Sequence, residues 1–269
     1  MIRRPIPRWL IAVLGVAGIL LAMLVYGAMS NRQTRINPDQ SVVPGMKAMG
    51  KGLEMVTKVQ GSPKNPKPRW FVEDLTATYW RLLLGLLAGI ALSIVFGIGM
   101  GAYMPVDAFF SPIVTFLAKI PPTAMLGVYM IAFGTHLQAY VALVALGIFF
   151  TMVHAIAQAA KKDVHADLID KAYTLGASEL EIILEVIWRQ VLPRVIENIR
   201  LQIGPAMVFL IAAEMLFGSE GIGYRIRLHS RLMNMNVVFI YLIVLGLSGL
   251  VIDWLLVRTR RWLCPWFGE

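Results

Sequence analysis

The chain has 269 residues, of which 58% are hydrophobic and only 15% are charged, and its mean hydropathy is +0.68. This composition excludes an ordinary soluble domain and is typical of a polytopic membrane protein. The single cysteine excludes a disulfide framework, and attraction to anionic lipid headgroups explains the net charge of +9 better than binding to nucleic acid does.

Six apolar stretches are long enough to cross a bilayer as helices. Only a helix satisfies its own backbone polar groups in lipid, so the sequence predicts an all-α polytopic membrane protein with about six transmembrane helices. The predicted spans are residues 9–29, 79–104, 109–133, 137–158, 199–217 and 237–257. The first follows several arginines but is too long for a typical signal peptide and lacks an Ala-x-Ala cleavage site, so we interpret it as a retained helix.

These spans divide the chain into an N-terminal transmembrane helix (1–29), an external segment (30–78), a five-span core (79–257) and a basic tail (258–269). One helical face in the external segment carries Met46, Met49, Leu53, Val56 and Val59. Lysines lie on the opposite face, which predicts a basic amphipathic helix on the membrane surface; a docking surface for a binding protein is the alternative. The Pro- and Lys-rich residues 62–69 predict an extended linker.

A charge and two prolines lie within the third predicted span, at Lys119, Pro121 and Pro122. Prolines remove backbone donors and bend a helix, and the freed carbonyls need partners inside the bundle or at a water-filled cavity. We interpret this bend as a candidate pathway element. A packing kink with Lys119 extending toward the interface remains the alternative.

Glu214 lies near the outer end of the fifth predicted span, among apolar neighbours. A carboxylate there needs water or a hydrogen-bond donor. It is either a helix-end anchor bonded to the following Ser219-Glu220-Gly221 turn, or part of a gate. The same turn continues through Gly223 and Tyr224, and we expect a tight external loop that lines the outer gate.

Other polar residues in the core are assigned structural roles. Asp253 is expected to pair with an arginine or a helix end, and His154 with Gln158, one turn apart, is expected to make an interhelical hydrogen-bond contact rather than a metal site. Gly204-Pro205 predicts a kink. Close packing between helices is predicted at Gly85, Gly89, Gly97 and Gly101. We identify no catalytic residue, metal site or phosphate-binding Gly-x-x-x-x-Gly-Lys loop.

A polar stretch at residues 161–200 interrupts the apolar spans. The apolar positions of its first helix are Leu168, Ile169, Ala172 and Leu175. Gly176 ends that helix, and Ala177 and Ser178 lead into a second helix at 179–190 that Pro193 ends. We interpret the two helices as a compact knob that projects from the membrane.

The order Asp170-Lys171-Ala172, three residues and then Gly176, resembles the cytoplasmic Glu-Ala-Ala loop of binding-protein-dependent ABC importer permeases. The chain departs from that pattern in Asp170, in Lys171, and in Trp188-Arg189 at the usual Leu-Pro position, although Leu192-Pro193 follows one turn later. Runs similar to the taurine/sulfonate/nitrate branch are Lys119-Ile120-Pro121-Pro122, Ala212-Ala213-Glu214-Met215 and Gly221-Ile222-Gly223-Tyr224. Within that branch the chain is similar to permeases that accompany urea-carboxylase-type enzymes.

The resemblance implies a type I ABC importer permease fold in the bacterial inner membrane, with both termini and a coupling loop (159–198) in the cytoplasm. It implies two ABC ATPase subunits that bind ATP and magnesium, a second permease copy as a homodimer, and a periplasmic or lipid-anchored substrate-binding protein. The implied ATPase-coupling residues are Asp170, Ala172, Leu175, Gly176, Ala177, Ser178, Glu179 and Pro193. The chain itself would bind no cofactor and catalyse no reaction.

The resemblance also implies a small polar substrate that contains nitrogen or sulfur. The branch points to taurine, sulfonates or nitrate, whereas the urea-carboxylase-associated relatives point to urea- or guanidine-like solutes. The alternative function is a stand-alone secondary transporter driven by an ion gradient. Such a carrier needs an internal inverted repeat and an ion-coupling site near mid-membrane, and we identify neither in the sequence.

Overall fold

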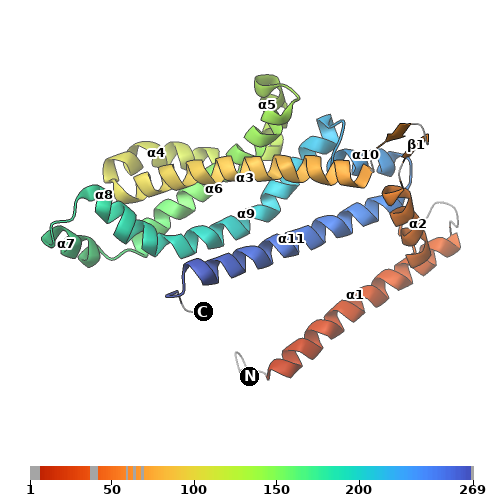
Figure 1. Cartoon of the computed structure of the whole chain (residues 1–269), viewed down its shortest axis with the longest axis horizontal. Coiled ribbons are helices and arrows are strands. Elements are labelled where there is room, and N and C mark those ends of the chain that lie inside the picture. Colours follow the sequence, from red (N-terminus) through yellow and green to blue (C-terminus); the bar gives the residue numbers. More distant parts are fainter. Residues whose placement is uncertain (1–6, 37–41, 59, 63–64, 68–69, 268–269) are drawn as a thin grey trace. The chain divides into compact units, whose positions relative to one another are not determined.

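The computed structural model describes residues 7–36, 42–58, 60–62, 65–67 and 70–267. These residues are almost entirely helical (Figure 1), which confirms the all-α prediction. Among them, five helices are long and apolar enough to cross a membrane, or six spans if one bent pair is counted as a span. The chain divides into two compact units, residues 1–71 with 226–243 and residues 72–225 with 244–269.

The first unit holds α1 (Arg8–Ile36), which runs seven residues beyond the predicted end of the first span. Most of its described apolar side chains are exposed, as expected of a helix whose surroundings are lipid. Near its C-terminal end, the Tyr26 hydroxyl donates to the Pro44 carbonyl at 2.7 Å, and the Ser30 hydroxyl donates to the Val43 carbonyl at 3.1 Å. These bonds tie α1 to the residues just before α2.

The predicted amphipathic helix is present as α2 (Met46–Thr57). Gly52 and Val56 are its buried positions, while Met46 and Leu53 remain exposed. Val59 lies outside the described residues. Placement of α2 on the membrane surface stays a prediction.

A short antiparallel pair, β1 (Gln60–Ser62) and β2 (Asn65–Lys67), occupies part of the predicted extended linker. The register pairs Gly61 with Pro66, so this part of the linker is a hairpin. Proline is tolerated in such a two-stranded ribbon because both strands are edge strands. The neighbouring residues 63–64 and 68–69 of the predicted linker lie outside the described residues.

The second unit is organised around a parallel pair of helices, α3 (Trp70–Ala102) and α6 (Leu137–Lys162). A Cβ atom on Gly85 would lie 2.6 Å from Val144, one on Gly89 would lie 2.8 Å from Ile148, and one on Gly97 would lie 2.7 Å from Ile156. The partner numbers rise together along both helices, so the small residues line one continuous contact. This confirms the predicted packing role of the glycines.

The third predicted span is not one kinked helix. It consists of α4 (Met104–Leu117) and a second arm made of η1 (Pro122–Met125) and α5 (Leu126–Phe133), with a bend of 81° between the arms. Lys119 lies in the break, and Pro121 has extended backbone angles (φ −62°, ψ 123°). Two consecutive residues without backbone donors break the helix rather than bend it.

A second correction concerns the helix after the knob. The knob consists of α7 (Ala166–Thr174) and the start of a helix that runs without interruption over Glu179–Phe217, through α8 (Glu179–Glu181), the π-helical η2 (Ile182–Ile187) and α9 (Trp188–Phe217). Pro193 therefore lies inside a helix instead of ending one. A proline deletes one backbone hydrogen bond, and burial of Pro193 together with Val191 and Val195 holds the helix on both sides of it.

The chain continues through α10 (Ile222–Arg231) and α11 (Met235–Leu263). Three helices cross the division between the two units: α3, α10 and α11. All the residues of the candidate site described below belong to the second unit.

Candidate coupling surface and transport pathway

The turn between α7 and α8 has a fixed geometry. The Ala177 N–H donates to the Ala172 carbonyl at 3.0 Å, and the Gly176 N–H donates to the Tyr173 carbonyl at 2.9 Å. These two bonds form a Schellman motif, whose pivot residue must be left-handed, and Gly176 has φ +84°. The sequence-based assignment of Gly176 as the end of the first helix is therefore confirmed.

The next residue starts the second helix of the knob. The Ser178 side chain accepts from the Glu181 N–H at 3.4 Å, and the Ser178 N–H donates to the Glu181 carboxylate at 2.8 Å, which together form a capping box. The Tyr103 hydroxyl, at the end of α3, donates to Glu179 at 3.0 Å. This hydrogen bond raises the pKa of Tyr103, because the protonated phenol is the form that donates.

The knob carries large apolar side chains that nothing in the described chain covers. Leu175 is 88% exposed and Leu180 is 66% exposed, and Asp170 is also exposed. Figure 1 shows α7 and α8 together at one end of the helices of this unit. Exposed leucines on a rigid, capped turn are typical of a protein interface. Ala172 and Ala177 are half-buried, and Pro193 is buried inside α9.

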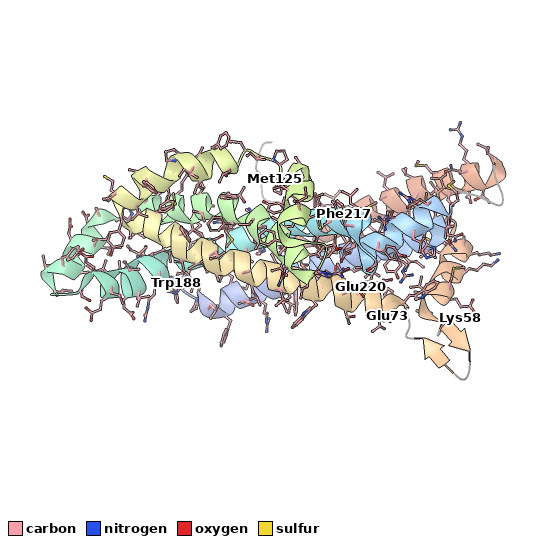
Figure 2. The ribbon with its side chains drawn as sticks, turned by 90° about the horizontal axis from the view of Figure 1, so that it is seen from above. Lys58, Glu73, Met125, Trp188, Phe217 and Glu220 are labelled. Atoms are coloured by element: carbon pink, nitrogen blue, oxygen red, sulfur yellow. The ribbon has the colours of Figure 1, made fainter. Side chains whose placement is uncertain are left out.

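The break in the third span opens onto a cavity of about 510 Å³ between the bent arms, α6 and α9. Pro122 and Met125 line it on one side, and Gln202 and Pro205 line it on the other. Figure 2 shows Met125 at the start of the bent arm. Pro121 is exposed beside the break, and Lys119 lines an adjacent smaller cavity. The predicted pathway residues of the third span are thus grouped around one break.

Glu214 is fully buried and accepts hydrogen bonds from two other elements. Both carboxylate oxygens lie 2.9 Å from the Thr78 hydroxyl, Arg81 donates to Oε1 at 2.9 Å, and the Gly223 N–H donates to Oε2 at 2.9 Å. The carboxylate thus joins α9 to α3 and to the start of α10. The structure supports the anchor interpretation, with the difference that its side-chain partners are on α3 and at Gly223 rather than in the Ser219–Gly221 turn.

The same cluster contains a second buried ion pair. The Arg225 Nε donates to Asp74 at 2.8 Å, and the Gly221 N–H donates to Asp74 at 3.1 Å. Arg81 also reaches Glu220 at 2.8 Å, and Figure 2 shows Glu220 beside α3, beyond Phe217 at the end of α9. Tyr224 is half-buried, with the Arg225 guanidinium 5.5 Å from its ring centre. Gly223 and Tyr224 lie in the first turn of α10, so the predicted external loop is shorter than expected. Gly221, Gly223 and Tyr224 belong to the Glu214 cluster, which is separate from the Lys119 break.

Sequence reasoning missed Asp74, Thr78, Arg81 and Arg225 as members of this cluster. The second predicted span started at residue 79, whereas α3 starts at Trp70, so Asp74 and Thr78 were assigned to the external segment. The spacing of four and then three residues from Asp74 to Arg81 places all three side chains on one helical face. This spacing could have identified the three residues in the sequence as one polar face of a helix.

The remaining polar predictions are resolved by specific contacts. The Asp253 carboxylate accepts two hydrogen bonds from the Arg200 guanidinium, at 2.8 and 3.0 Å, which confirms the expected arginine partner. His154 and Gln158 contact each other at 2.7 Å along α6, so the contact is within one helix instead of between helices. The helix α9 continues through Gly204-Pro205.

Comparisons with known proteins identify the family. The model of binding-protein-dependent transport system inner membrane components matches residues 85–263. The chain belongs to this family. It is 30% identical to a probable ABC transporter permease protein of Brucella melitensis, over 72% of this chain and 79% of that protein. It is 29% identical to the taurine transport system permease protein TauC of Escherichia coli, over 73% of this chain and 71% of that protein.

The permease also shares its fold with a chain of the MetNI methionine ABC transporter in inward-facing conformations, with a TM-score of 0.63 and 18% identity, over 71% of this chain and 94% of that one. The expected type I ABC importer permease fold is thereby confirmed. The protein is a multi-pass inner-membrane transport component.

Proposed function

We propose that this permease works as a homodimer with two ABC ATPase subunits and a substrate-binding protein, and that the knob around Gly176 docks into the ATPase. The observation that carries the proposal is the rigid, capped turn with exposed Leu175 and Leu180. A coupling contact must be stiff, because a flexible loop would absorb the ATPase movement instead of passing it on. ATP and magnesium are bound by the ATPase, and ATP hydrolysis takes place there.

The continuous helix Glu179–Phe217 provides the mechanical connection. It begins at the knob and ends three residues after Glu214, which anchors the outer turn to α3 through Thr78 and Arg81. A displacement of the knob is therefore transmitted along one helix to the opposite end of the unit. This arrangement supports alternating access, in which ATPase closure shifts the helices between inward-open and outward-open states.

The number of helices and the open side of the unit support the homodimer. The described chain supplies five spans, or six with the bent pair, and the cavity beside Pro122 and Pro205 has an open side. A second copy would close that side and enclose a pathway between the two permeases. Both termini are assigned to the cytoplasm, which agrees with Arg258, Arg260 and Arg261 near the end of α11.

The substrate is proposed to be a small polar compound that contains nitrogen or sulfur. The relative named for taurine supports the sulfonate side of this range, and the sequence runs shared with urea-carboxylase-associated permeases support a urea- or guanidine-like solute. The binding protein selects the solute before it reaches the permease.

The coupling role is tested by replacing Gly176 in the transporter reconstituted with its ATPase and binding protein. Gly176→Arg forces a side chain onto a backbone with φ +84°, and we expect it to abolish ATP-driven uptake while membrane insertion is retained. Gly176→Asn is the matched control, because asparagine tolerates this backbone conformation, and it should retain most of the uptake. Normal uptake by Gly176→Arg would reject the coupling role.

The alternative, a secondary carrier, is tested by the energy source. Vesicles that contain the permease alone should show no uptake in response to a proton or sodium gradient. Gradient-driven uptake without the ATPase would establish the carrier function in place of the importer function.

A further inference from the structure

Three cavities of the second unit share residues and follow one face of α6. Besides the cavity of about 510 Å³ at the break, there is one of about 210 Å³ beside Lys119 and one of about 370 Å³ near the end of the helix. Thr151 lines all three, and His154 lines the two smaller ones. The cavities therefore lie next to one another along α6, and we call this row of cavities the α6 track.

The polar residues of α6 follow that track in register. Thr151, His154, Gln158 and Lys162 are separated by three, four and four residues, so they lie on one side of the helix. The intervening residues Met152, Val153, Ile156 and Ala157 are buried in the hydrophobic core. Polar side chains along a membrane-spanning helix face water or protein rather than lipid. The exposed Thr151 and Gln158 thus mark a side of α6 that faces water or another protein instead of lipid.

The fixed charge of the α6 track is positive. Among the described residues, its ionised side chains are Lys119, Lys162, Arg194 and Asp163. Arg194 is paired with Asp163 at 3.2 Å and with Glu197 at 3.4 Å, which offsets its charge. No ion pair of the described residues includes Lys119 or Lys162. These two lysines therefore leave the track with an uncompensated positive charge.

Lys119 places this charge near the middle of the span, on a side chain that is exposed instead of buried in the bundle. It shares a cavity with Thr151, which is the fifteenth of the 26 residues of α6 and so lies near the middle of that span. An ammonium group at this depth costs several kcal/mol unless it contacts water or an anion. The double proline that breaks the third span leaves room for the lysine beside the helix instead of within a regular turn.

We propose that the α6 track conducts an anionic group of the substrate, with Lys119 as the counter-charge at mid-span and Thr151, His154 and Gln158 as hydrogen-bonding partners. This inference rests on the proposed permease function and narrows its substrate class to solutes with a sulfonate, carboxylate or nitrate-type anion. A guanidinium ion would be repelled by Lys119, and neutral urea would gain nothing from it.

The charge preference of the track is measurable without knowing the substrate. In assembled transporter with Cys264→Ser as background, Thr151→Cys is exposed to two methanethiosulfonate reagents, the anionic sulfonatoethyl and the cationic trimethylammonioethyl compound. Each rate is divided by the rate of the same reagent with a free thiol. We expect the anionic reagent to react about tenfold faster, as a positive cleft concentrates anions, and Lys119→Gln should bring the ratio close to one. Gln158→Cys provides an independent position on the same track, should Thr151→Cys fail to assemble.

Leu87→Cys is the control, because Leu87 is an exposed apolar residue of α3 and should react with neither reagent. A ratio of one or below in the parent background would overturn the anion path. The anion path would also be overturned if the thiols at both track positions reacted as slowly as the thiol of Leu87→Cys. Trapping the ATPase with ATP and vanadate tests the proposed function separately: rates that keep their charge preference but do not respond to trapping would reject ATPase coupling and leave the anion path in place.

Discussion

The Nη1 atom of Arg81 lies 2.9 Å from the Oε1 atom of Glu214, and this ion pair joins α3 to α9 inside the helix bundle. The Glu214 side chain has no exposed surface, and that of Arg81 is 10% exposed. Two charges buried this far from water are stable only when each keeps its partner.

Removal of Glu214 should therefore destabilise the permease strongly. Glu214→Ala leaves the guanidinium of Arg81 without its buried partner, at a cost of about 3–5 kcal/mol in the free energy of unfolding. Thermal unfolding of the purified protein in detergent measures the loss. Glu220→Gln is the matched control, since the Glu220 side chain that binds the other terminal nitrogen of Arg81 is 58% exposed and should contribute less than about 1 kcal/mol. Equal effects of the two changes would contradict the anchor role of Glu214.

Gly221 should be irreplaceable for two reasons. Its backbone has φ +105°, and a Cβ atom at this position would lie 2.5 Å from Oε1 of Glu214. Gly221→Ala is expected to cost more than about 2 kcal/mol of stability and to reduce uptake, because the carboxylate cannot move without losing its donors. Gly246→Ala serves as the control, since nothing lies within 4 Å of a Cβ there; if both variants unfold at the same temperature, the close approach is not important.

The contact between α3 and α6 depends on the absence of side chains. Gly89→Val should force the helices apart, because even a Cβ atom would lie 2.8 Å from Ile148 and 2.9 Å from the Ala145 carbonyl. We expect reduced amounts of folded protein in the membrane and a lower unfolding temperature. Gly99→Val, on the same helix but with open space around it, controls for the lower helix propensity of valine. The prediction fails if Gly89→Val and Gly99→Val accumulate equally.

Docking of the ATPase should depend on Leu175. This side chain is 88% exposed, and burial of a leucine contributes about 1.5–3 kcal/mol. Leu175→Ser should therefore weaken ATPase binding by about tenfold or more, measured by co-purification and by ATP-driven uptake. Leu232→Ser changes a leucine that is 59% exposed at the end of α10, and it should not affect ATPase binding. Unchanged co-purification of Leu175→Ser would argue against docking through the knob.

Cys264 should react slowly with alkylating reagents. Burial raises the pKa of its thiol, although the nearby Arg260 acts in the opposite direction. A raised pKa lowers the thiolate fraction at pH 8, so the reaction rate with iodoacetamide should increase as the pH rises above the ordinary range of a free thiol. The control is the same protein in sodium dodecyl sulfate, where the exposed thiol should react faster. Equal native and denatured rates at pH 8 would show that Cys264 is accessible.

Some features follow from local order along the chain. Apolar runs determine where helices cross lipid, since an unsatisfied backbone group costs too much there. Glycines at intervals of four or eight residues determine the α3 contact face, and Gly176 followed by Ser178 determines the capped turn. These signals depend on residues within two turns of each other, so the spans, the knob and the family resemblance were readable from the sequence.

Other features depend on residues far apart in the chain. The partners of Glu214 lie 136 and 133 residues away, at Thr78 and Arg81, and no local pattern pairs them. Tertiary packing also decided the conformation at the prolines. The pair at 121–122 breaks its helix, whereas Pro193 lies inside a continuous helix because buried neighbours support both sides of it. Packing between helices therefore determined which of the conformations allowed by local propensity these segments adopt.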